Sequence, residues 1–461
     1  MASHIDFDKP ETITGKKVLV LGLGLLGGGV GVCRFFAHHG ATVTVFDAKA
    51  SSVLSSSVQA LSAFKSIVFS LDGQMPVSLE SYDMVIKGPS FPSTHPILIA
   101  INRLKIPVTM EAALFVRFAH TRIIGVTGTR GKSTVTRMIS DALRAHYTRG
   151  RVFESGNIPG TCALELLYEV KPEDVVVLEL SSWQLAGLHM ERVSPELAGF
   201  TSMYPDHLNF YVSMREYIHD KTAIFAYQSK GQQLFIAENC KGDVFEVATP
   251  PEGVVTHTIT ENDFTNDLRF LQGQHNRRNA ALALAVTHAV LPEVQIESIA
   301  DTIRSSHSLS CRQEVIAQKG QVTVVNDSAS TTPVACAVAI ETFHDRAIIL
   351  VLGGNSKNVP LDPLIEKLAE HKTAVKRIYF LPGTCTDELM ADERFARVSI
   401  PYTRPQESFE STIALAFATA EQQETPTVLL FSPAATSFAQ FRNEFHRGEI
   451  FHSVISAIIA Q

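Results

Sequence analysis

Short uninterrupted runs of apolar residues recur along the chain, separated by glycine-rich or polar turns and by helical patterns. In the first part of the chain these runs occupy residues 17–21, 42–46, 84–87 and 107–110. Their length and their Val, Ile and Leu content are typical of strands buried on both faces. Strands of this kind that alternate with helices predict a parallel sheet with helices on both sides.

The same alternation continues to the end of the chain. Further strands are predicted at residues 122–127, 174–180, 199–203, 322–326, 347–354, 377–381 and 427–431. At 461 residues the chain is too long for one ordinary core. We expect an α/β protein of three doubly wound domains: a Rossmann-like domain at 1–118, a central P-loop mononucleotide-binding domain at 119–308 and a Rossmann-like domain at 309–461.

Composition and charge exclude several classes of function. With 45% hydrophobic and 19% charged residues, the chain has a globular composition. Its net charge of −7 and the lack of a long basic run argue against binding to nucleic acid or to a membrane surface. Six scattered cysteines with no C-x-x-C pair favour reduced thiols over a disulphide framework or a zinc site. The N-terminus lacks the apolar core of a signal peptide, and no apolar run reaches the length of a membrane span. We therefore expect a cytoplasmic protein.

The strongest chemical motif lies at residues 122–134, which predict a strand, a glycine turn and the start of a helix. Two glycines, Gly128 and Gly131, allow the turn to present backbone N–H groups to a phosphate at the positive end of the helix. Lys132 can then reach the terminal phosphates, and the Ser133 hydroxyl can bind Mg²⁺. The alternative is a βα connection without a ligand. Val126 stands where the common motif has glycine, so the motif is a Gly-Thr-x-Gly-Lys-Ser variant.

A carboxylate, Glu179, ends the apolar strand that follows this motif. In nucleotide-dependent α/β enzymes an acidic group at this edge of the sheet holds Mg²⁺. The alternative is a helix cap at the strand end.

Near the N-terminus, residues 22–27 form a Gly-x-Gly-x-x-Gly loop between a strand and a helix, and Asp47 ends the next strand. This arrangement is the dinucleotide-fold fingerprint and indicates a site for a nucleotide diphosphate and a ribose. The extra glycines after this loop indicate close helix–strand packing or a widened phosphate loop. Asp47 has the alternative of a capping or turn residue.

Other candidates depend on context. Taken without the other motifs, His207 is expected to be a capping or core histidine, and Lys221 a solvated lysine on an amphipathic helix. Residues 272–279 are then expected to be an ordinary capped helix start. In the third domain, the strand tips at 326–328, 353–357 and 432–434 are where a substrate site is expected.

A set of short motifs spread over the whole chain resembles the Mur ligases. They are GVTGTRGKST (125–134), LELSSWQL (178–185), DHL (206–208), Tyr217-x-x-x-Lys221, GQHNxxN (273–279), CRQE (311–314), NDS (326–328), LGGxxK (352–357) and SPAxxSF (432–438). The resemblance is greatest to the D-glutamate-adding members of peptidoglycan synthesis. It implies a monomeric enzyme that uses ATP to join D-glutamate to UDP-N-acetylmuramoyl-L-alanine through an acyl phosphate.

The resemblance also implies the site residues. ATP contacts would be Gly128, Thr129, Gly131, Lys132, Ser133, Thr134, Asn279, Arg312 and Asp327. Contacts to the UDP substrate would be Gly22, Gly24, Leu25, Leu26, Gly27, Asp47, Asn157 and Ser182. The amino acid's carboxylates would be held by Thr331, Lys357, Ser437 and the backbone of Phe438. One Mg²⁺ would be bound by Ser133 and Glu179, and a second by His207 and a carbamylated Lys221. Lys132, His207 and Lys221 would be the catalytic residues.

Departures from the family pattern keep alternatives open. Ala329 replaces a usual lysine, and Glu444 replaces an aromatic neighbour of the amino acid. In the first loop Leu26 replaces a small hydroxyl residue. A related ligase with another acceptor, such as a folylpolyglutamate synthase-like enzyme, is the first alternative. An NAD-dependent oxidoreductase and a catalytically silent nucleotide-binding module are the others.

Overall fold

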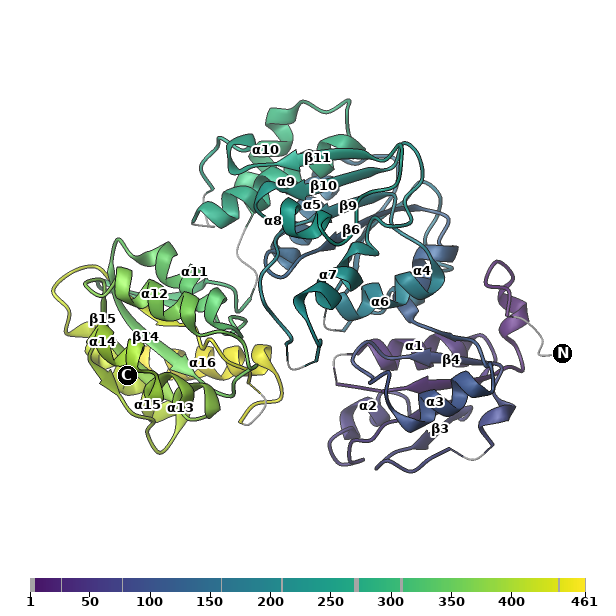
Figure 1. Ribbon diagram of the computed structural model, residues 1–461, viewed down its shortest axis with the longest axis horizontal. Helices are drawn as coiled ribbons and strands as arrows, with labels where there is room; N and C mark the ends of the chain where they lie inside the picture. The colour runs from purple at the N-terminus through teal and green to yellow at the C-terminus, as the bar shows by residue number, and fades with distance from the viewer. Residues whose placement is uncertain are drawn as a thin grey trace. The chain divides into compact units, whose positions relative to one another are not determined.

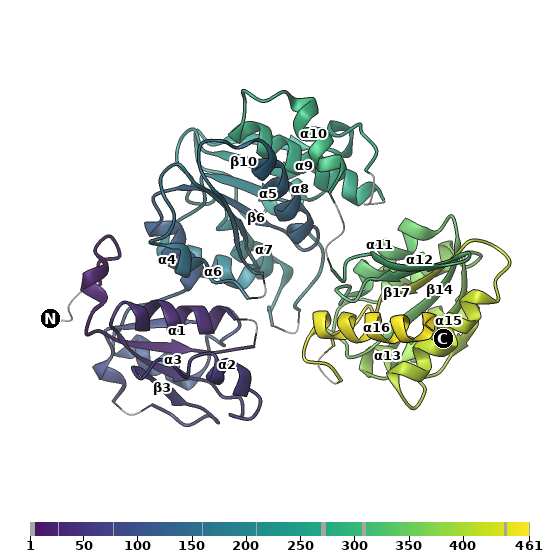
Figure 2. The ribbon, with the colours of Figure 1, turned by 180° about the vertical axis from the view of Figure 1, so that it is seen from behind.

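A computed structural model describes residues 5–25, 27–76, 78–158, 160–208, 210–268, 273–306, 310–437 and 440–460 (Figures 1 and 2). The chain forms two compact units. The first comprises residues 1–203, 217–266 and 278–303, and the second comprises 204–216, 267–277 and 304–461. The first unit holds two sheets and the second unit holds one.

The N-terminal sheet of the first unit has five parallel strands in the order β3-β2-β1-β4-β5. The strands are β1 (Lys17–Leu21), β2 (Thr42–Phe46), β3 (Ile67–Ser70), β4 (Met84–Lys87) and β5 (Val108–Thr109). The helices are α1 (Gly28–His38), α2 (Ser55–Gln59), α3 (Pro96–Arg103) and α4 (Glu111–Phe118), with 3-10 turns η1 (Pro10–Ile13) and η2 (Leu79–Ser81). Strand order reverses between β1 and β4, which is where ligands bind in such sheets.

The central sheet has six parallel strands in the order β11-β10-β9-β6-β8-β7. The strands are β6 (Arg122–Thr127), β7 (Val152–Gly156), β8 (Val175–Glu179), β9 (Leu197–Phe200), β10 (Gln233–Ala237) and β11 (Val255–Ile259). The helices are α5 (Lys132–His146), α6 (Ser182–Glu191), α7 (Met214–Thr222), α8 (Glu238–Phe245), α9 (Gln274–Val290) and α10 (Ile296–Arg304), with 3-10 turns η3 (Ala163–Leu166) and η4 (Glu261–Asp263). The sheet places β6, which precedes the phosphate motif, next to β8, which ends in Glu179.

The sheet of the second unit has the order β12-β13-β17-β14-β15-β16, and β12 alone among these strands runs antiparallel to its neighbour. The strands are β12 (Glu314–Lys319), β13 (Val322–Asn326), β14 (Ala347–Gly353), β15 (Val375–Leu381), β16 (Tyr402–Thr403) and β17 (Thr427–Phe431). The helices are α11 (Pro333–Phe343), α12 (Asp362–Glu370), α13 (Thr384–Ala391), α14 (Glu393–Val398), α15 (Phe409–Glu421) and α16 (Glu444–Ile459).

Strand β14 shows why the strands of this sheet have uninterrupted apolar sequences. Ile348, Leu350 and Leu352 belong to a core cluster on one face, together with residues of α11, α12 and α14. Ile349 and Val351 belong to a second cluster on the other face, with residues of α15 and α16. Because successive side chains of a strand point to opposite faces, a strand covered on both sides must be apolar at every position.

The prediction of a doubly wound α/β fold is confirmed. The three sheets span residues 17–109, 122–259 and 314–431; the domain boundaries near 118 and 308 stay a prediction. Strands β3, β7, β10, β11, β12 and β16 were not predicted. Several of them lie at or near sheet edges and carry polar residues, so their apolar signal is weak.

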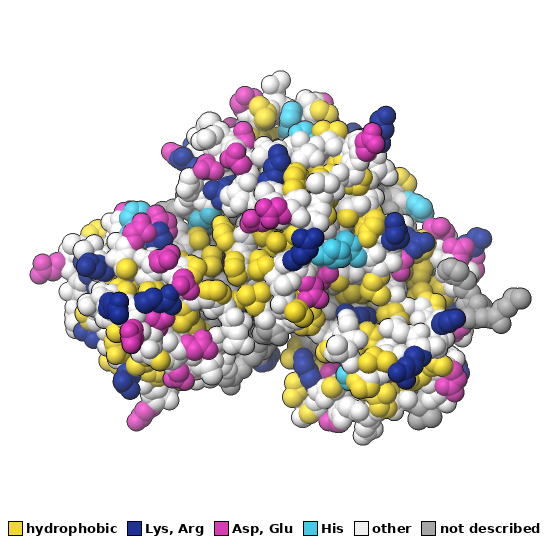
Figure 3. Space-filling view, viewed as in Figure 1, with side chains coloured by type: hydrophobic (Ala, Val, Ile, Leu, Met, Phe, Trp, Pro, Cys, Tyr) yellow, Lys and Arg dark blue, Asp and Glu magenta, His cyan; other side chains and the backbone are white. Residues whose placement is uncertain are grey.

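On the face shown in Figure 3, the side chains of Lys and Arg lie among those of Asp and Glu across the surface. None of the helices in the described part of the chain has both the length and the apolar character needed to cross a membrane.

Candidate active site

The phosphate motif forms the turn that its glycines predict. Helix α5 begins directly after Gly131, which has φ 86°, and Gly128 has φ 141°. A side chain at Gly131 would collide with Asn279, and one at Gly128 would collide with the Thr201 hydroxyl. Glycine is therefore required at both positions by backbone conformation and by space.

The turn is held by the segment that directly follows the neighbouring strand β9. The backbone N–H of Thr129 donates to the carbonyl oxygen of Ser202 at 2.8 Å, and the N–H of Arg130 donates to the Ser202 hydroxyl at 2.9 Å. These bonds fix the loop backbone before any ligand binds. The loop therefore loses less conformational entropy when a ligand binds.

Lys132 lies over the turn that precedes it. Its ammonium donates to the carbonyl oxygens of Gly128 at 3.1 Å and Thr129 at 3.2 Å. Ser133 and Thr134 occupy the first turn of α5, and Gly131 supplies no side-chain cap to that helix. The positive helix end and the ammonium therefore lie at the same loop, as an anionic phosphate requires.

Glu179 is a buried carboxylate beside this loop. It pairs in register with Val126 of β6, and its side chain is nearly inaccessible to solvent. One oxygen, Oε1, accepts a hydrogen bond from Asn157 Nδ2 at 2.8 Å, whereas Oε2 has no hydrogen-bond partner among the described residues. An orphaned buried carboxylate oxygen is costly unless a cation neutralises it.

The alternative of a helix cap for Glu179 does not hold. Helix α6 is capped by Ser181, whose side chain accepts from Gln184 N while Gln184 reaches back to the Ser181 backbone. The carboxylate oxygen of Glu179 and the hydroxyl oxygen of Ser133 are the donors that Mg²⁺ prefers, so these residues fit a Mg²⁺ ion.

Lys221 is a buried lysine, in contrast to the solvated helix lysine that its sequence context alone suggests. It is 1% exposed, and its Nζ donates to the carbonyl oxygen of Gly128 at 3.0 Å. The ring of Tyr217 lies 4.8 Å from the same Nζ. Lys132 and Lys221 therefore converge on one oxygen.

In the first loop, Asp47 has the turn role that the sequence left open. Its Oδ2 accepts from the backbone N–H of Leu23 at 2.9 Å and of Gly24 at 3.3 Å, and its Oδ1 accepts from Lys49 N at 2.9 Å. The carboxylate thus fixes the loop of which Gly22, Leu25 and Gly27 are also part; Leu26 lies outside the described residues.

Two of the additional glycines in this region are explained by packing. A side chain at Gly29 would overlap the Leu23 carbonyl, and one at Gly31 would overlap Cys162, next to η3. The backbone of helix α1 therefore lies in direct contact with Leu23 and Cys162. Two other residues are predicted to contact the UDP substrate. The side chain of Asn157 donates a hydrogen bond to Glu179, and Ser182 is the first residue of α6.

In the second unit, Asp206 brings predicted residues together. Its Oδ1 lies 3.2 Å from Lys357 Nζ, and that ammonium also donates to the Thr331 hydroxyl at 3.1 Å. The backbone N–H of His207 donates to the same Oδ1 at 2.8 Å. Asp206 is 3% exposed, and sequence reasoning did not single it out as a site residue.

Asp327 is a second buried carboxylate of this unit. Its Oδ2 accepts from the hydroxyls of Ser330 at 2.5 Å and Ser432 at 2.7 Å, and its Oδ1 accepts from Gln313 N at 3.1 Å. Burial raises the pKa of Asp327 to about 6, against the lowering effect of these bonds and of the Arg312 guanidinium. The predicted pair Arg312 and Asp327 is thus electrostatically coupled.

Arg447 is a structural residue that sequence reasoning missed. Its guanidinium is buried and donates to the backbone oxygens of Ser328 at 2.8 Å, Ala435 at 3.1 Å and Thr436 at 3.2 Å. Burial lowers the pKa of Arg447 to about 10. It ties the segment after β13 to the segment before Ser437. The Ser437 hydroxyl is itself buried and without a hydrogen-bond partner in the described parts of the chain. Phe438 lies outside those parts.

The chain is similar to known proteins along almost its whole length. Residues 126–288 match the family model of the Mur ligase middle domain. A UDP-N-acetylmuramoylalanine--D-glutamate ligase from Roseiflexus sp. (strain RS-1) is 31% identical over 477 residues, which cover 96% of this chain and 99% of the relative.

Solved structures share the fold. MurF ligase from Thermotoga maritima in complex with ADP superimposes with a TM-score of 0.59 at 16% identity, covering 97% of each chain. Mycobacterium tuberculosis folylpolyglutamate synthase with ADP and AMPPCP gives a TM-score of 0.53 at 14% identity, covering 74% of this chain and 95% of the other.

The three-sheet α/β fold, the phosphate-loop motif and the buried carboxylate of Glu179 are together those of a nucleotide-dependent ligase of the Mur type. Within that class, the chain belongs to the family of UDP-N-acetylmuramoylalanine--D-glutamate ligases. The oxidoreductase interpretation of the first loop is set aside.

Proposed function

We propose that this protein joins D-glutamate to UDP-N-acetylmuramoyl-L-alanine at the expense of ATP, in the cytoplasm and as a monomer. The observation that carries the proposal is the phosphate loop with the unpartnered Glu179 oxygen beside it. It occurs in a chain that is similar over almost its whole length to UDP-N-acetylmuramoylalanine--D-glutamate ligases. The reaction needs a site that holds ATP phosphates and a metal, and this loop has the donors for both.

In the first step, a carboxylate oxygen of the muramoyl substrate attacks the γ-phosphorus and ADP leaves, which gives an acyl phosphate. Lys132 and the first turn of α5 bind and neutralise the phosphates. Asn279, Arg312 and Asp327 are further ATP contacts. Ser133 and Glu179 would hold one Mg²⁺, and His207 and Lys221 would hold a second ion. When bound, these ions would supply charge neutralisation between the anionic reactants.

Lys221 would hold its ion as a carbamate. The Nζ ammonium first loses a proton, and the resulting amine adds to CO₂, forms an N–C bond and loses a second proton, which converts a cation into an anionic oxygen ligand. Burial and a shared acceptor with Lys132 both disfavour a second ammonium at this point. NMR with ¹³CO₂ tests this: wild type gives a carbamate signal, and Lys221→Arg does not.

In the second step, the amine of D-glutamate attacks the acyl carbon and phosphate leaves, which forms the amide bond. Lys357, Thr331 and Ser437, with the Phe438 backbone, hold the carboxylates of the amino acid. The buried, unpartnered hydroxyl of Ser437 supports this assignment. The loop at Gly22, Gly24, Leu25, Leu26 and Gly27, with Asp47, Asn157 and Ser182, holds the UDP substrate.

An acceptor screen tests the function. D-glutamate, L-glutamate, D-alanyl-D-alanine and tetrahydrofolate with L-glutamate are compared for ATP-dependent phosphate release. Release with D-glutamate and UDP-N-acetylmuramoyl-L-alanine alone supports the proposal. A preference for another pair supports the related-ligase alternative, which Ala329 and Glu444 leave open.

A further inference from the structure

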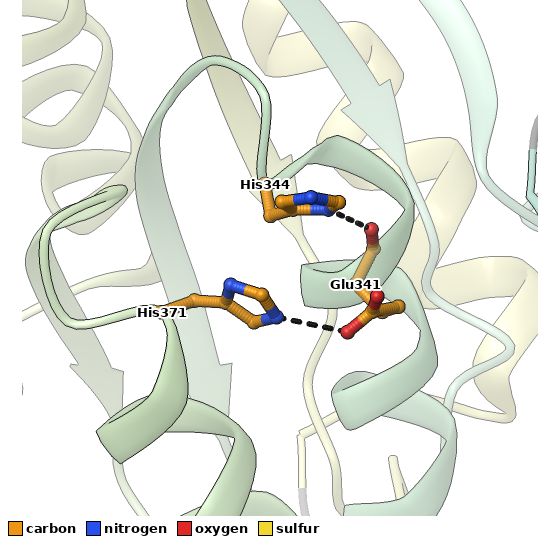
Figure 4. Close-up of side chains that lie close together, drawn as sticks. All are labelled: Glu341, His344 and His371. Atoms are coloured by element: carbon orange, nitrogen blue, oxygen red, sulfur yellow. Dashed lines mark hydrogen bonds and ion pairs between the residues drawn. The ribbon is translucent and has the colours of Figure 1, made fainter.

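A cluster of two histidines and a glutamate lies in the second unit at the ends of two helices (Figure 4). Glu341 is in the last turn of α11, and His344 follows the end of that helix. His371 follows the end of α12. One potential ligand atom of each of the three side chains lies within 4.8 Å of the others, and the two ring centres are 4.7 Å apart.

Hydrogen bonds orient the imidazoles. His344 Nδ1 lies 2.6 Å from the backbone oxygen of Glu341, and His371 Nε2 lies 2.8 Å from Glu341 Oε2. When His344 Nδ1–H donates to that carbonyl, the lone pair of its Nε2 remains available. A backbone carbonyl that fixes the tautomer in this way is the usual outer partner of a metal-binding histidine.

The charge around the cluster favours a cation. Lys367 Nζ lies 2.6 Å from Glu341 Oε2 and 2.6 Å from Glu370 Oε2, so one ammonium faces two carboxylates. Glu370 Oε1 is also 3.8 Å from His371 Nε2. In addition, α11 and α12 both direct their C-terminal ends at the cluster, and helix C-termini stabilise positive charge.

We propose that Glu341, His344 and His371 bind a divalent transition-metal ion of the Zn²⁺ type, which clasps α11 to α12. Two imidazoles and a carboxylate suit Zn²⁺, Co²⁺, Ni²⁺ or Cu²⁺, whereas Mg²⁺ prefers oxygen ligands. Glu341 and His344 are exposed, so water completes the coordination. The ion displaces Lys367 from Glu341, and Lys367 keeps Glu370 as its partner.

The position separates this site from the amino-acid site. Thr331 precedes the first residue of α11, whereas Glu341 is eight residues into that helix, roughly 12 Å along its axis. The site is therefore structural, and it does not depend on the function proposed above.

The test titrates the full-length chain with Co²⁺ and Zn²⁺ in excess Mg²⁺, which saturates the oxygen sites. Visible absorption of bound Co²⁺ and calorimetry of Zn²⁺ are the readouts. Wild type is expected to bind one ion, and His344→Asn and His371→Asn to weaken binding at least tenfold. His452→Asn, at an exposed histidine of α16, is the matched control and leaves binding unchanged.

Lys367→Met distinguishes a metal site from an ion-pair cluster, because it removes the competing ammonium and is expected to strengthen Zn²⁺ binding. The proposal is overturned if wild type shows no Co²⁺ absorption above that of His344→Asn and His371→Asn, or if Lys367→Met does not strengthen binding.

Discussion

Lys132 and Lys221 donate hydrogen bonds to the same oxygen, the backbone carbonyl of Gly128, at 3.1 and 3.0 Å. They come from α5 and α7, far apart in the sequence, and meet because the phosphate loop lies between them. Two like charges at one acceptor repel each other, and an anion bound at the loop would weaken that repulsion.

Replacing Lys221 separates its chemical role from its structural cost. Lys221→Met is expected to lower kcat at least about a hundredfold through loss of a metal ligand, while thermal stability changes far less, because methionine retains most of the buried packing of the side chain. Steady-state kinetics and a melting curve check both. Lys230→Met, at an exposed lysine, is the control. Full activity of Lys221→Met would contradict the metal role.

Glu179→Gln keeps the size of the side chain and its acceptor for Asn157, but it removes the charge. We expect the Mg²⁺ concentration for half-maximal activity to rise at least about tenfold, with kcat reduced at saturating Mg²⁺. A Mg²⁺ titration of phosphate release measures this. Glu173→Gln, at an exposed position nearby in sequence, should behave as wild type. An unchanged Mg²⁺ requirement in Glu179→Gln would remove Glu179 from the metal site.

Lys357→Met should raise the KM for D-glutamate roughly ten- to a hundredfold, the value of a charge-assisted hydrogen bond. The KM for ATP should change little. Initial rates at varied D-glutamate and ATP give the two constants, and Lys376→Met at an exposed lysine is the control. Equal effects on both KM values would point to loss of folding in the second unit.

Burial raises the pKa of Glu111, at the start of α4, from 4.5 to about 7. The folded state therefore holds this proton over a pH range in which the unfolded state has lost it. Its stabilising contribution is complete below about pH 4.5, declines as pH rises and is lost above about pH 7, by up to about 3 kcal/mol.

Glu111→Gln should abolish this pH-dependent component and be more stable than wild type at pH 8. Urea unfolding of both proteins at pH 5 and pH 8 measures the difference. If the two proteins lose the same stability between these pH values, the Glu111 carboxyl does not hold the proton.

The phosphate loop and Glu179 could be predicted because their signals are local. A strand, two glycines and a helix start lie within thirteen residues, and a strand tip fixes where Glu179 points. By contrast, Asp206 and Arg447 have partners more than a hundred residues away in sequence. Their residue types are ordinary for a turn and a helix, so no short pattern marks them.

Asp47 illustrates the intermediate case. Its place at the end of β2 followed from the pattern, but its contacts to Leu23 and Gly24 depend on how the loop folds back. The sequence therefore could predict the position of Asp47 but not its hydrogen bonds to the loop, and a contact of Asp47 with a ribose stays a prediction.

We propose that this chain uses the Lys132 loop to drive amide-bond formation with ATP. The most direct measurement follows ADP and the D-glutamyl product together, from UDP-N-acetylmuramoyl-L-alanine, D-glutamate and MgATP, for wild type and Lys132→Met. We predict one ADP for each product molecule in wild type and a loss of both in Lys132→Met. Product formed without ADP, or equal turnover by the two proteins, would contradict the account.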